Sequence, residues 1–523
     1  SDGKKDLVKE DIIMKNTGLH AVPPPAGGCP EHLWQGFDFG VPAPALDRLP
    51  QGPFAIEDDG GWLLAGSSTP DAQYRANPGM GFVGYAWEES GPSLMARAGR
   101  ETLEQHLSHL LAFPFTDVLY IRCDWRDVQS APGQLALSPI WEHTFDMARK
   151  AGKRVAFRIQ SSQTGGQPER YSLPDFLRQR IPYVTLRKFR TGSGFPDTYQ
   201  EPDYTSPAFF DALCELNRLL ADRFDGDPAL EFVDLMMYGF WGEGHTGGYH
   251  NPLPYQACED AFLKMTAAQM EIWRHTPLAV NVQTDISRAG NRAVQELCMR
   301  QGTYLRTDSV LINEPSANEH MAHRPPHTAG IIEDGYFRYF DPDDPRLAAD
   351  SAGVTNIENT ILHTLDLGGS YFSLWTEGQN LQRYYARYPD AFNALGARMG
   401  YRVRPSWVYQ RKRGSRMELV LMLHNDGVAS IPGRLRLSLY AENGSLLSTG
   451  TLDAGQPFAG RTRQCAFLLP EGYTARTVSV AAALRDKKGE RPIRWACGQN
   501  IRPDGRFEIE LQPADSTRWR KDV

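Results

Sequence analysis

The sequence predicts an α/β fold, a (β/α)8 TIM barrel followed by an antiparallel β-sandwich, on three observations. Between residues 79 and 401, eight short apolar segments with strand character alternate with amphipathic helical segments, which is the order of a barrel of parallel strands. No GxGxxG motif follows the first strand, and this disfavours a doubly wound sheet, the main alternative. After Tyr401, short alternating strands separated by turn residues replace the helical rhythm, as in a sandwich.

The predicted barrel strands are apolar runs bounded by polar or turn residues. In chain order they cover 81–85, 117–122, 154–159, the run that begins at Glu231, 278–282, 303–306, 328–333 and 370–375. Apolar residues at helical spacing predict the intervening helices. These helices cover 101–111, 138–151, 206–224, 255–275, 291–301 and 356–367. A polar insertion at 161–205 is too long for an ordinary connection and is expected to be functional or disordered.

Two flanking regions complete the predicted organisation. Residues 1–78 are rich in Pro and Gly, and we expect an irregular N-terminal extension with short strands around 54–56 and 62–64. Residues 402–523 form the predicted C-terminal β-sandwich. Its expected strands include 417–423, 435–439, 477–481 and 507–511.

Composition narrows the function classes. The 523 residues carry 56 Lys and Arg against 63 Asp and Glu, a formal charge of −7, which disfavours nucleic acid or an anionic membrane as the main partner. No 18-residue apolar run predicts a membrane span. The seven cysteines show no CxxC or other metal-ligand spacing, and we expect most of them to be buried free thiols. Cys465 and Cys497 could pair.

The start of the chain, without Met or an apolar signal, is compatible with export after signal removal. The oligomeric state stays open.

The most informative stretch is 231–245 (EFVDLMMYGFWGEGH), where an apolar run changes abruptly to Gly, Trp, Glu and His. The glycines allow a sharp turn close to a ligand. Trp241, Glu243 and His245 alternate, so an extended chain would present them on one side. A flat apolar face, a carboxyl and an imidazole together suit a carbohydrate. The alternative is a buried strand followed by a loop with a helix-capping Glu.

Polar and aromatic residues collect at the predicted C-terminal ends of the strands, where barrels of this class place their active sites. Each one alone could cap a helix or lie in a solvated loop, but together they predict a binding site. They are Arg122, Asp124, Trp125, Arg158, Gln160, Tyr238, Trp241, Glu243, His245, Asn281, Gln283, Asp308, Glu333, Trp375 and Glu377.

Glycoside hydrolysis needs two carboxyl groups that flank one bond, one protonated and one ionised. Glu243 and Glu333 follow the fourth and seventh strands, on opposite sides of the predicted barrel mouth. Arg122 and Arg158 could keep a nucleophilic carboxylate ionised. We also expect His245 or Tyr238 to orient the acid, and Trp241 and Trp375 to stack on sugar faces.

Several motifs resemble clan A glycoside hydrolases, especially the family 42 β-galactosidase-like group and bacterial barrel proteins of this type with a C-terminal β-sandwich. The first is 125–134 (WRDVQSAPGQ), followed by the helix that begins at Ser138. The others are 77–82 (NPGMGF), 238–245 (YGFWGEGH) and 395–402 (LGARMGYR). The resemblance covers about residues 77–515. It implies a retaining glycosidase with Glu243 as acid/base and Glu333 as nucleophile, without a metal or organic cofactor.

The sequence departs from the clan A pattern at two places. Gly242 stands where an Asn usually contacts the sugar 2-hydroxyl, and residues 129–132 (QSAP) replace the Glu-Pro expected after the second strand. The 2-hydroxyl contact, and with it the identity of the sugar, is therefore open. The candidates to replace the missing Asn are Asn281, Gln283 and His245.

Alternatives remain for both residues and function. Glu314, in 312–315 (INEP), is a rival nucleophile, and Glu377 is the fallback partner. A barrel that binds carbohydrate without catalysis, or a polysaccharide lyase with His245 or a Tyr as base, would carry similar residues. The sequence leaves open the anomeric configuration, the linkage and whether the action is exo or endo.

Overall fold

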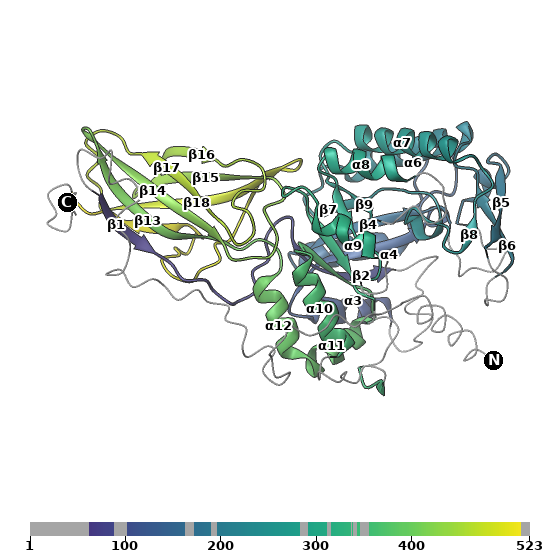
Figure 1. The fold of residues 1–523 in the computed structure, drawn as a ribbon, viewed down its shortest axis with the longest axis horizontal. Coiled ribbons are helices and arrows are strands. Elements are labelled where there is room, and N and C mark those ends of the chain that lie inside the picture. The colour runs from purple at the N-terminus through teal and green to yellow at the C-terminus, as the bar shows by residue number, and fades with distance from the viewer. Residues whose placement is uncertain are drawn as a thin grey trace.

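The computed structural model describes residues 62–87, 102–162, 172–189, 196–282, 291–310, 315–335, 337, 342–345 and 355–513. The molecule is elongated, with the sandwich at one end and the barrel at the other (Figure 1).

Eight parallel strands close into a barrel, so the predicted fold class is confirmed. Each strand pairs with the next along the chain, and the last pairs with the first through Tyr371 and Gly81. In order they are β2 (Gly81–Trp87), β3 (Thr116–Asp124), β4 (Arg154–Gln160), β7 (Leu230–Asp234), β9 (Leu278–Asn281), β10 (Tyr304–Arg306), β11 (Gly330–Glu333) and β12 (Tyr371–Leu374).

A helix follows each strand, and the apolar faces of these helices pack on the outside of the barrel. The first seven are α3 (Leu103–Ala112), α4 (Pro139–Lys150), α6 (Pro207–Phe224), α7 (Tyr255–Ile272), α8 (Arg292–Arg300), α9 (Pro315–Ala322) and α10 (Asn356–Asp366). After β12 come α11 (Gly378–Arg387) and α12 (Pro389–Arg398), and a short α5 (Asp175–Arg178) lies in the third loop. Pro opens α4 and α6 at the first turn, where its missing N–H costs nothing.

The inside of the barrel changes from apolar to charged along the strands. Side chains alternate between the two faces of a strand. The inward positions near the strand starts carry apolar or aromatic residues, such as Val118, Phe232 and Ala279. The next inward positions carry Arg122, Arg158, Asp234, Asn281, Arg306, Glu333 and Ser373. The apolar layer therefore closes the barrel beneath a charged layer at its C-terminal end.

The fourth strand is shorter than the apolar run in the sequence. β7 ends at Asp234, whose side chain points inward to Arg158 and Arg306. The expectation of an extended chain through Trp241, Glu243 and His245 is wrong. Residues 240–242 form a 3-10 turn, and Trp241 has a φ of 57°.

A small antiparallel sheet lies at the end of the barrel far from the sandwich (Figure 1). Two of its strands, β5 (Tyr183–Lys188) and β6 (Thr198–Pro202), come from the polar insertion. The third, β8 (Tyr249–His250), comes from the loop after β7 and pairs with β5. The sheet thus joins the third and fourth loops of the barrel mouth.

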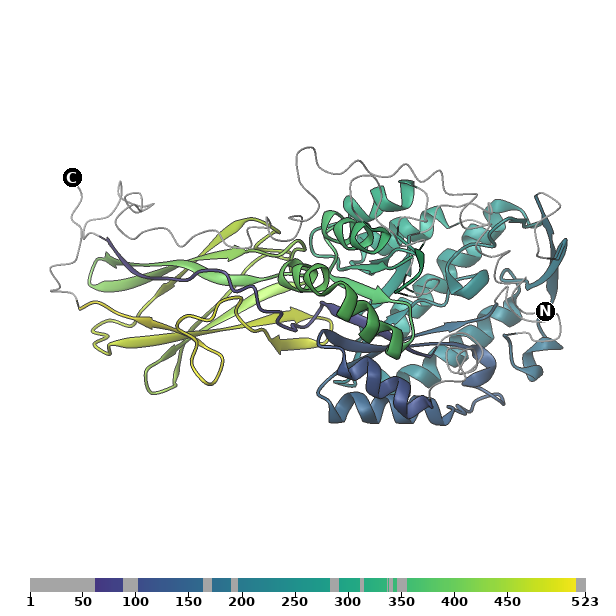
Figure 2. The ribbon, with the colours of Figure 1, turned by 90° about the horizontal axis from the view of Figure 1, so that it is seen from below.

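The C-terminal region forms two antiparallel sheets whose apolar faces share one core. The strands are β13 (Val403–Arg413), β14 (Arg416–Asn425), β15 (Arg434–Ala441), β16 (Leu446–Thr451), β17 (Thr462–Leu468), β18 (Thr477–Asp486), β19 (Gly489–Pro492) and β20 (Phe507–Glu510). One further strand, β1 (Trp62–Ser67), comes from the stretch expected to be an extension and pairs with β13. Figure 2 shows it running along the sandwich before the chain enters the barrel.

An ion-pair network joins the sandwich to the closed end of the barrel. Glu231, on β7, contacts Arg154 of the barrel and, at 2.9 Å, Arg491 of the sandwich. Its carboxylate also accepts hydrogen bonds from the Tyr371 hydroxyl and the Gly79 amide. Burial raises the pKa of Glu231, but the two arginines outweigh it and lower the pKa to about 2. The sandwich therefore covers the end opposite the charged layer.

The structure also bears on two smaller predictions, which concern a disulfide and a membrane-spanning helix. Cys465 and Cys497 are both free thiols, so the disulfide considered for them is absent. Among the described helices, none has the length and apolar character needed to cross a membrane.

Candidate active site

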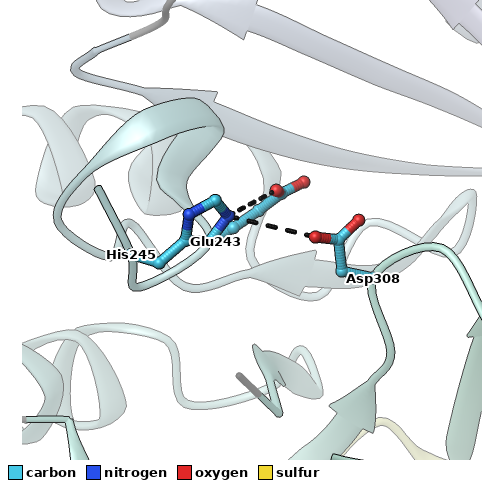
Figure 3. A group of neighbouring side chains, drawn as sticks. All are labelled: Glu243, His245 and Asp308. Atoms are coloured by element: carbon cyan, nitrogen blue, oxygen red, sulfur yellow. Dashed lines mark hydrogen bonds and ion pairs between the residues drawn. The ribbon is translucent and has the colours of Figure 1, made fainter. Parts of the chain in front are cut away.

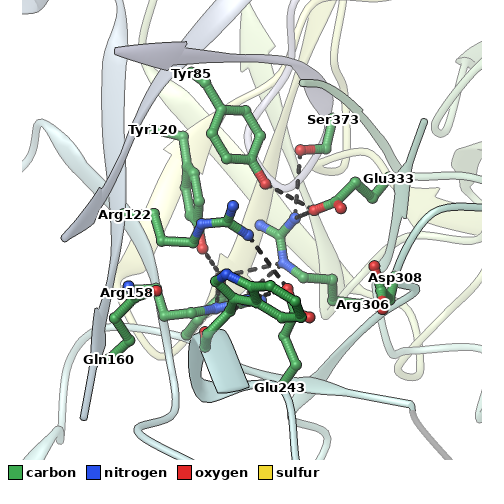
Figure 4. Close-up of polar contacts among 12 residues, drawn as sticks. Tyr85, Tyr120, Arg122, Arg158, Gln160, Glu243, Arg306, Asp308, Glu333 and Ser373 are labelled. Carbon is green, nitrogen blue, oxygen red and sulfur yellow. Dashed lines mark hydrogen bonds and ion pairs between the residues drawn. The ribbon is translucent and has the colours of Figure 1, made fainter. Parts of the chain in front are cut away.

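The mouth of the barrel holds three buried arginines among several carboxyl groups (Figure 4). Arg122, Arg158 and Arg306 are at most 3% exposed at the side chain. Arg158 and Arg306 pair with Asp234 through their Nε atoms, at 3.4 Å and 3.1 Å. The Tyr120 hydroxyl also donates a hydrogen bond to Asp234. Asp234 therefore fixes the base of the cluster and leaves the other guanidinium nitrogens for the groups above it.

The loop at residues 239–245, called here the Glu243 loop, brings the central carboxyl into this cluster. Gly239, Gly242 and Gly244 all have positive φ. A Cβ at Gly239 would lie 2.1 Å from the carbonyl oxygen of His245, so no larger residue fits there. The Phe240 amide closes the loop by donating to the same carbonyl, at 2.9 Å. The glycine-rich sequence is thus a structural requirement of the loop.

Glu243 is held as a carboxylate. Its Oε1 lies 2.9 Å from Arg158 Nη1 and 3.3 Å from Arg122 Nη1, and its Oε2 lies 3.3 Å from His245 Nε2. Burial raises its pKa, but the His245 hydrogen bond and the charges of the two arginines outweigh burial and lower the pKa to about 2. Glu243 is therefore ionised at any physiological pH.

Glu333, at the end of β11, has its pKa shifted in the opposite direction. Its Oε2 accepts a 2.7 Å hydrogen bond from the Tyr85 hydroxyl and lies 3.5 Å from Arg306 Nη1. Burial and the negative charge of Glu243 raise its pKa, and the single long arginine contact does not reverse this. The two carboxyl groups predicted to be catalytic therefore have pKa values pushed apart.

His245 lies between two carboxyl groups (Figure 3). Its Nε2 is 3.3 Å from Glu243 and 3.9 Å from Asp308. The Gly247 amide donates to its Nδ1 at 3.1 Å, so neutral His245 carries its hydrogen on Nε2. Burial raises the pKa of Asp308 well above its ordinary value, and the negative charges of Glu243 and Glu333 raise it further.

Glu243, His245 and Asp308 are also the described side chains best placed for a metal ion, with ligand atoms within 4.8 Å of one another. Two features oppose a cation there. Two guanidinium groups already contact Glu243, and the hydrogen on His245 Nε2 points toward the carboxylates. A metal ligand needs a free lone pair at that nitrogen. The donor set therefore fits a hydrogen-bonded network and not a metal site.

Two tryptophans stand beside the charged cluster with partly exposed side chains. The Arg122 guanidinium lies 5.4 Å from the centroid of the Trp375 ring. Trp241, in the Glu243 loop, has its ring centroid 6.0 Å from that of His245. Both are placed to offer an apolar face to a ligand beside the carboxyls.

Two amide side chains complete the mouth. Gln160 donates a 2.8 Å hydrogen bond to the buried Asp124. Asn281, at the end of β9, is 2% exposed, and within the described part of the chain neither of its side-chain polar atoms has a hydrogen-bond partner. A buried amide without hydrogen-bond partners lowers the stability of the fold unless a ligand or a water molecule provides those partners. Asn281 is thus a candidate for recognition of a polar ligand group.

Not every residue predicted for the site lies in it. Trp125 is fully buried in the outer core, where its ring packs on Phe209, because it follows β3 in a 3-10 turn and not on the strand. Tyr238 also belongs to the outer core and packs against Phe262. Glu377 is the residue before α11. Gln283 and Glu314 lie outside the described residues.

The structure also adds residues that were not predicted for the site. They are Tyr85, Tyr120, Asp234 and Arg306. A signal was available, because Tyr120 and Arg122 share one face of β3, and Arg306 ends β10 just before Asp308. Counting inward positions back from each strand end would have found them.

No family model matches the sequence, and no curated protein matches it. The structure is similar to the catalytic domain of β-amylase from Paenibacillus polymyxa, with 10% identity, a TM-score of 0.41, and coverage of 61% of this chain and 100% of that one. It is similar to endo-glycoceramidase II from Rhodococcus sp., with 12% identity, a TM-score of 0.37, and coverage of 76% and 100%. It is also similar to β-galactosidase from the psychrophilic Marinomonas ef1, with 12% identity, a TM-score of 0.39, and coverage of 60% and 58%. Likeness at this level does not assign a function.

Proposed function

We propose that the protein is a retaining glycoside hydrolase that acts on a glycan or oligosaccharide through Glu243 and Glu333. The observation that carries the proposal is the pair of buried carboxyls at the barrel mouth whose environments drive their pKa values in opposite directions. Glycoside hydrolysis requires one ionised and one protonated carboxyl beside the same bond. A pair with no chemical role would have no need of pKa values shifted in opposite directions.

The electrostatics favour roles opposite to those that the clan A resemblance implies. Glu243 is ionised and held by two arginines, so it suits the nucleophile. Glu333, whose pKa is raised by burial and by the charge of Glu243, suits the general acid. In the first step Glu243 would attack the anomeric carbon while Glu333 protonates the leaving oxygen. In the second, Glu333 would take a proton from water, whose oxygen displaces Glu243.

Other groups at the mouth fit a sugar. Trp241 and Trp375 offer aromatic faces, which suit the apolar faces of a sugar ring. Asn281 offers an NH2 donor group and a carbonyl acceptor that have no partners among the described residues, as a hydroxyl-binding group would. In this proposal Asn281 takes over the hydroxyl contact that Gly242 cannot make.

The lyase alternative finds less support. A lyase would need His245 or a Tyr to remove a proton. His245 carries its hydrogen on Nε2, the nitrogen that faces the site, and so does not present a base there. The hydroxyls of Tyr85 and Tyr120 donate to Glu333 and Asp234, and burial raises the pKa of both.

The activity is tested with a panel of 4-nitrophenyl α- and β-glycosides and natural oligosaccharides. The wild type should release aglycone or reducing sugar from at least one of them. Glu243→Gln and Glu333→Gln should each lose at least about a thousandfold in kcat/KM, the scale of removing a catalytic group. Binding of the panel without turnover by the wild type would instead support a non-catalytic carbohydrate-binding barrel.

The roles are tested by trapping. A 2-deoxy-2-fluoro glycoside of the sugar that is cleaved should esterify the nucleophile, and mass spectrometry of the digested protein should place the label on Glu243. A label on Glu333 would restore the roles implied by the resemblance. Failure to trap any ester, together with an inverted first-formed anomer by NMR, would contradict the retaining mechanism.

A further inference from the structure

The small sheet of β5, β6 and β8 packs directly against the Glu243 loop. Leu186 of β5, Phe240 of the loop and Tyr249 of β8 form one buried apolar cluster, with Trp241 at its edge. The pairing of Arg187 with His250 joins the sheet to the segment that follows the loop. The loop is therefore clamped on one side by the insertion that precedes α6.

A buried carboxyl lies beneath this contact. Glu201, on β6, is 1% exposed, and among the described residues no Lys or Arg forms an ion pair with it. Its Oε2 accepts a 2.5 Å hydrogen bond from the Ser162 hydroxyl, and its Oε1 accepts one from the Tyr204 hydroxyl. A buried carboxyl group with hydroxyl partners and no ion pair to Lys or Arg among the described residues is unusual enough to need a reason.

Both hydroxyl-bearing residues also hold the backbone of the Glu243 loop. The Tyr204 oxygen accepts a 3.0 Å hydrogen bond from the Gly239 amide. The Ser162 carbonyl accepts a 2.9 Å hydrogen bond from the Trp241 amide. The first turn of the loop is thus fixed at two points, two residues apart, and Glu201 orders both partners.

The direction of each hydrogen bond decides whether ionised or protonated Glu201 can order both Tyr204 and Ser162. As a carboxylate it accepts from both hydroxyls, and the Tyr204 lone pair stays free for the Gly239 amide. As an acid it must itself donate to one hydroxyl, which disturbs one of the two partners. The titratable groups that face it are Tyr199 on the same strand, Tyr204, and His245 in the loop. Burial raises the pKa of Glu201 to about 7, and the hydrogen bonds from Ser162 and Tyr204 offset this only in part.

We propose that Glu201 is a positioning residue, which through Tyr204 and Ser162 fixes the Glu243 loop and does so fully only as a carboxylate. Since the loop carries Glu243 and Trp241, the ionisation of Glu201 near neutral pH sets how well the site is assembled. The inference rests on the proposed hydrolase for its effect on turnover. Its effect on the loop can be measured without a substrate.

The structural part is tested by amide hydrogen exchange of the peptide that covers 239–245, in folded full-length protein. Glu201→Gln mimics the protonated state, and Tyr204→Phe removes the acceptor of the Gly239 amide. At pH 8 each should exchange about tenfold faster in this loop than the wild type, the scale of losing a hydrogen bond that involves a charged group. Glu215→Gln is the matched control, because Glu215 also accepts an amide hydrogen bond but contacts Gln129 and Gly133 outside the loop. Unchanged protection in both loop variants would overturn the proposal.

The pH dependence gives a second readout. After correction for the intrinsic rate, amide exchange of the loop in the wild type should slow as pH rises through about 7, the pKa of the Glu201 carboxyl. In Glu201→Gln this step should be absent. With a cleaved substrate, the ratio of wild-type to variant kcat/KM should rise about tenfold across the same range. A kcat/KM ratio that does not change with pH, together with a changed amide exchange rate in the loop, would overturn the positioning role. A wild type that cleaves no substrate would count only against the hydrolase proposal.

Discussion

Replacing Glu243 by Gln should cost stability in a way that depends on pH. A folded-state pKa of about 2, against an ordinary value of 4.5, means that the native cluster prefers the carboxylate. At about 1.4 kcal/mol per pKa unit this preference amounts to roughly 3 kcal/mol. Because the pKa is lowered on folding, the contribution is present above pH 4.5 and is lost as pH falls toward 2. Glu243→Gln lacks it at every pH.

The assay is chemical denaturation of the wild type and Glu243→Gln between pH 2.5 and 7. The difference in unfolding free energy should be about 3 kcal/mol at pH 7 and should shrink steadily below pH 4.5. Glu231→Gln is the matched control, since Glu231 is also buried between two arginines and also has a pKa of about 2. It should show the same stability pattern, but folded Glu231→Gln should keep its kcat, because Glu231 lies at the closed end of the barrel.

Two results would refute this reasoning. A difference that stays constant from pH 7 to pH 2.5 would show that Glu243 is not preferentially ionised in the native state. Equal loss of kcat in folded Glu231→Gln and Glu243→Gln would show that activity follows the overall stability of the barrel and not the charge at its mouth.

Three further predictions concern residues around this cluster. Asn281→Ala should lower kcat/KM about tenfold or more through loss of a hydroxyl contact, without lowering the unfolding midpoint, because its amide has no partner within the described chain. Trp125→Phe should leave kcat/KM unchanged in steady-state assays and lower the unfolding free energy by about 1–3 kcal/mol, since it loses buried volume and the 2.8 Å hydrogen bond to Gln129. Arg491→Ala should lower the unfolding free energy at pH 7 by about 3 kcal/mol in denaturant titrations. Because the pKa of Glu231 should rise in this variant, its unfolding free energy should also change less with pH in the acid range.

The barrel was predictable because each of its strands carries a local signal. All eight strands lie within or beside the expected segments, and the six expected helices are present. The end of β7 was not predictable from hydropathy, since Leu235 to Met237 remain apolar after the strand has ended. Asp234, the last residue of the strand, pairs with arginines on two other strands, and such tertiary contacts leave no signal in local hydropathy.

The site was predictable in location but not in detail. The rule that active sites lie at strand ends located Arg122, Arg158, Glu243 and Glu333. The same rule placed Trp125 in the site, whereas the 3-10 turn after β3 directs this side chain into the outer core. Nor could a sequence pattern show which carboxyl has the raised pKa, because that depends on how many arginines reach each one.

The position of β1 has a consequence for synthesis of the protein. Trp62 pairs with Arg411, so the whole barrel is inserted between two neighbouring strands of one sheet. While the chain is being made, β1 must wait unpaired until the barrel and β13 have been synthesised. A barrel produced alone, by stopping at residue 401, would keep β1 without its partner and expose an open strand edge that favours aggregation. Attempts to isolate the barrel should therefore begin after Ser67.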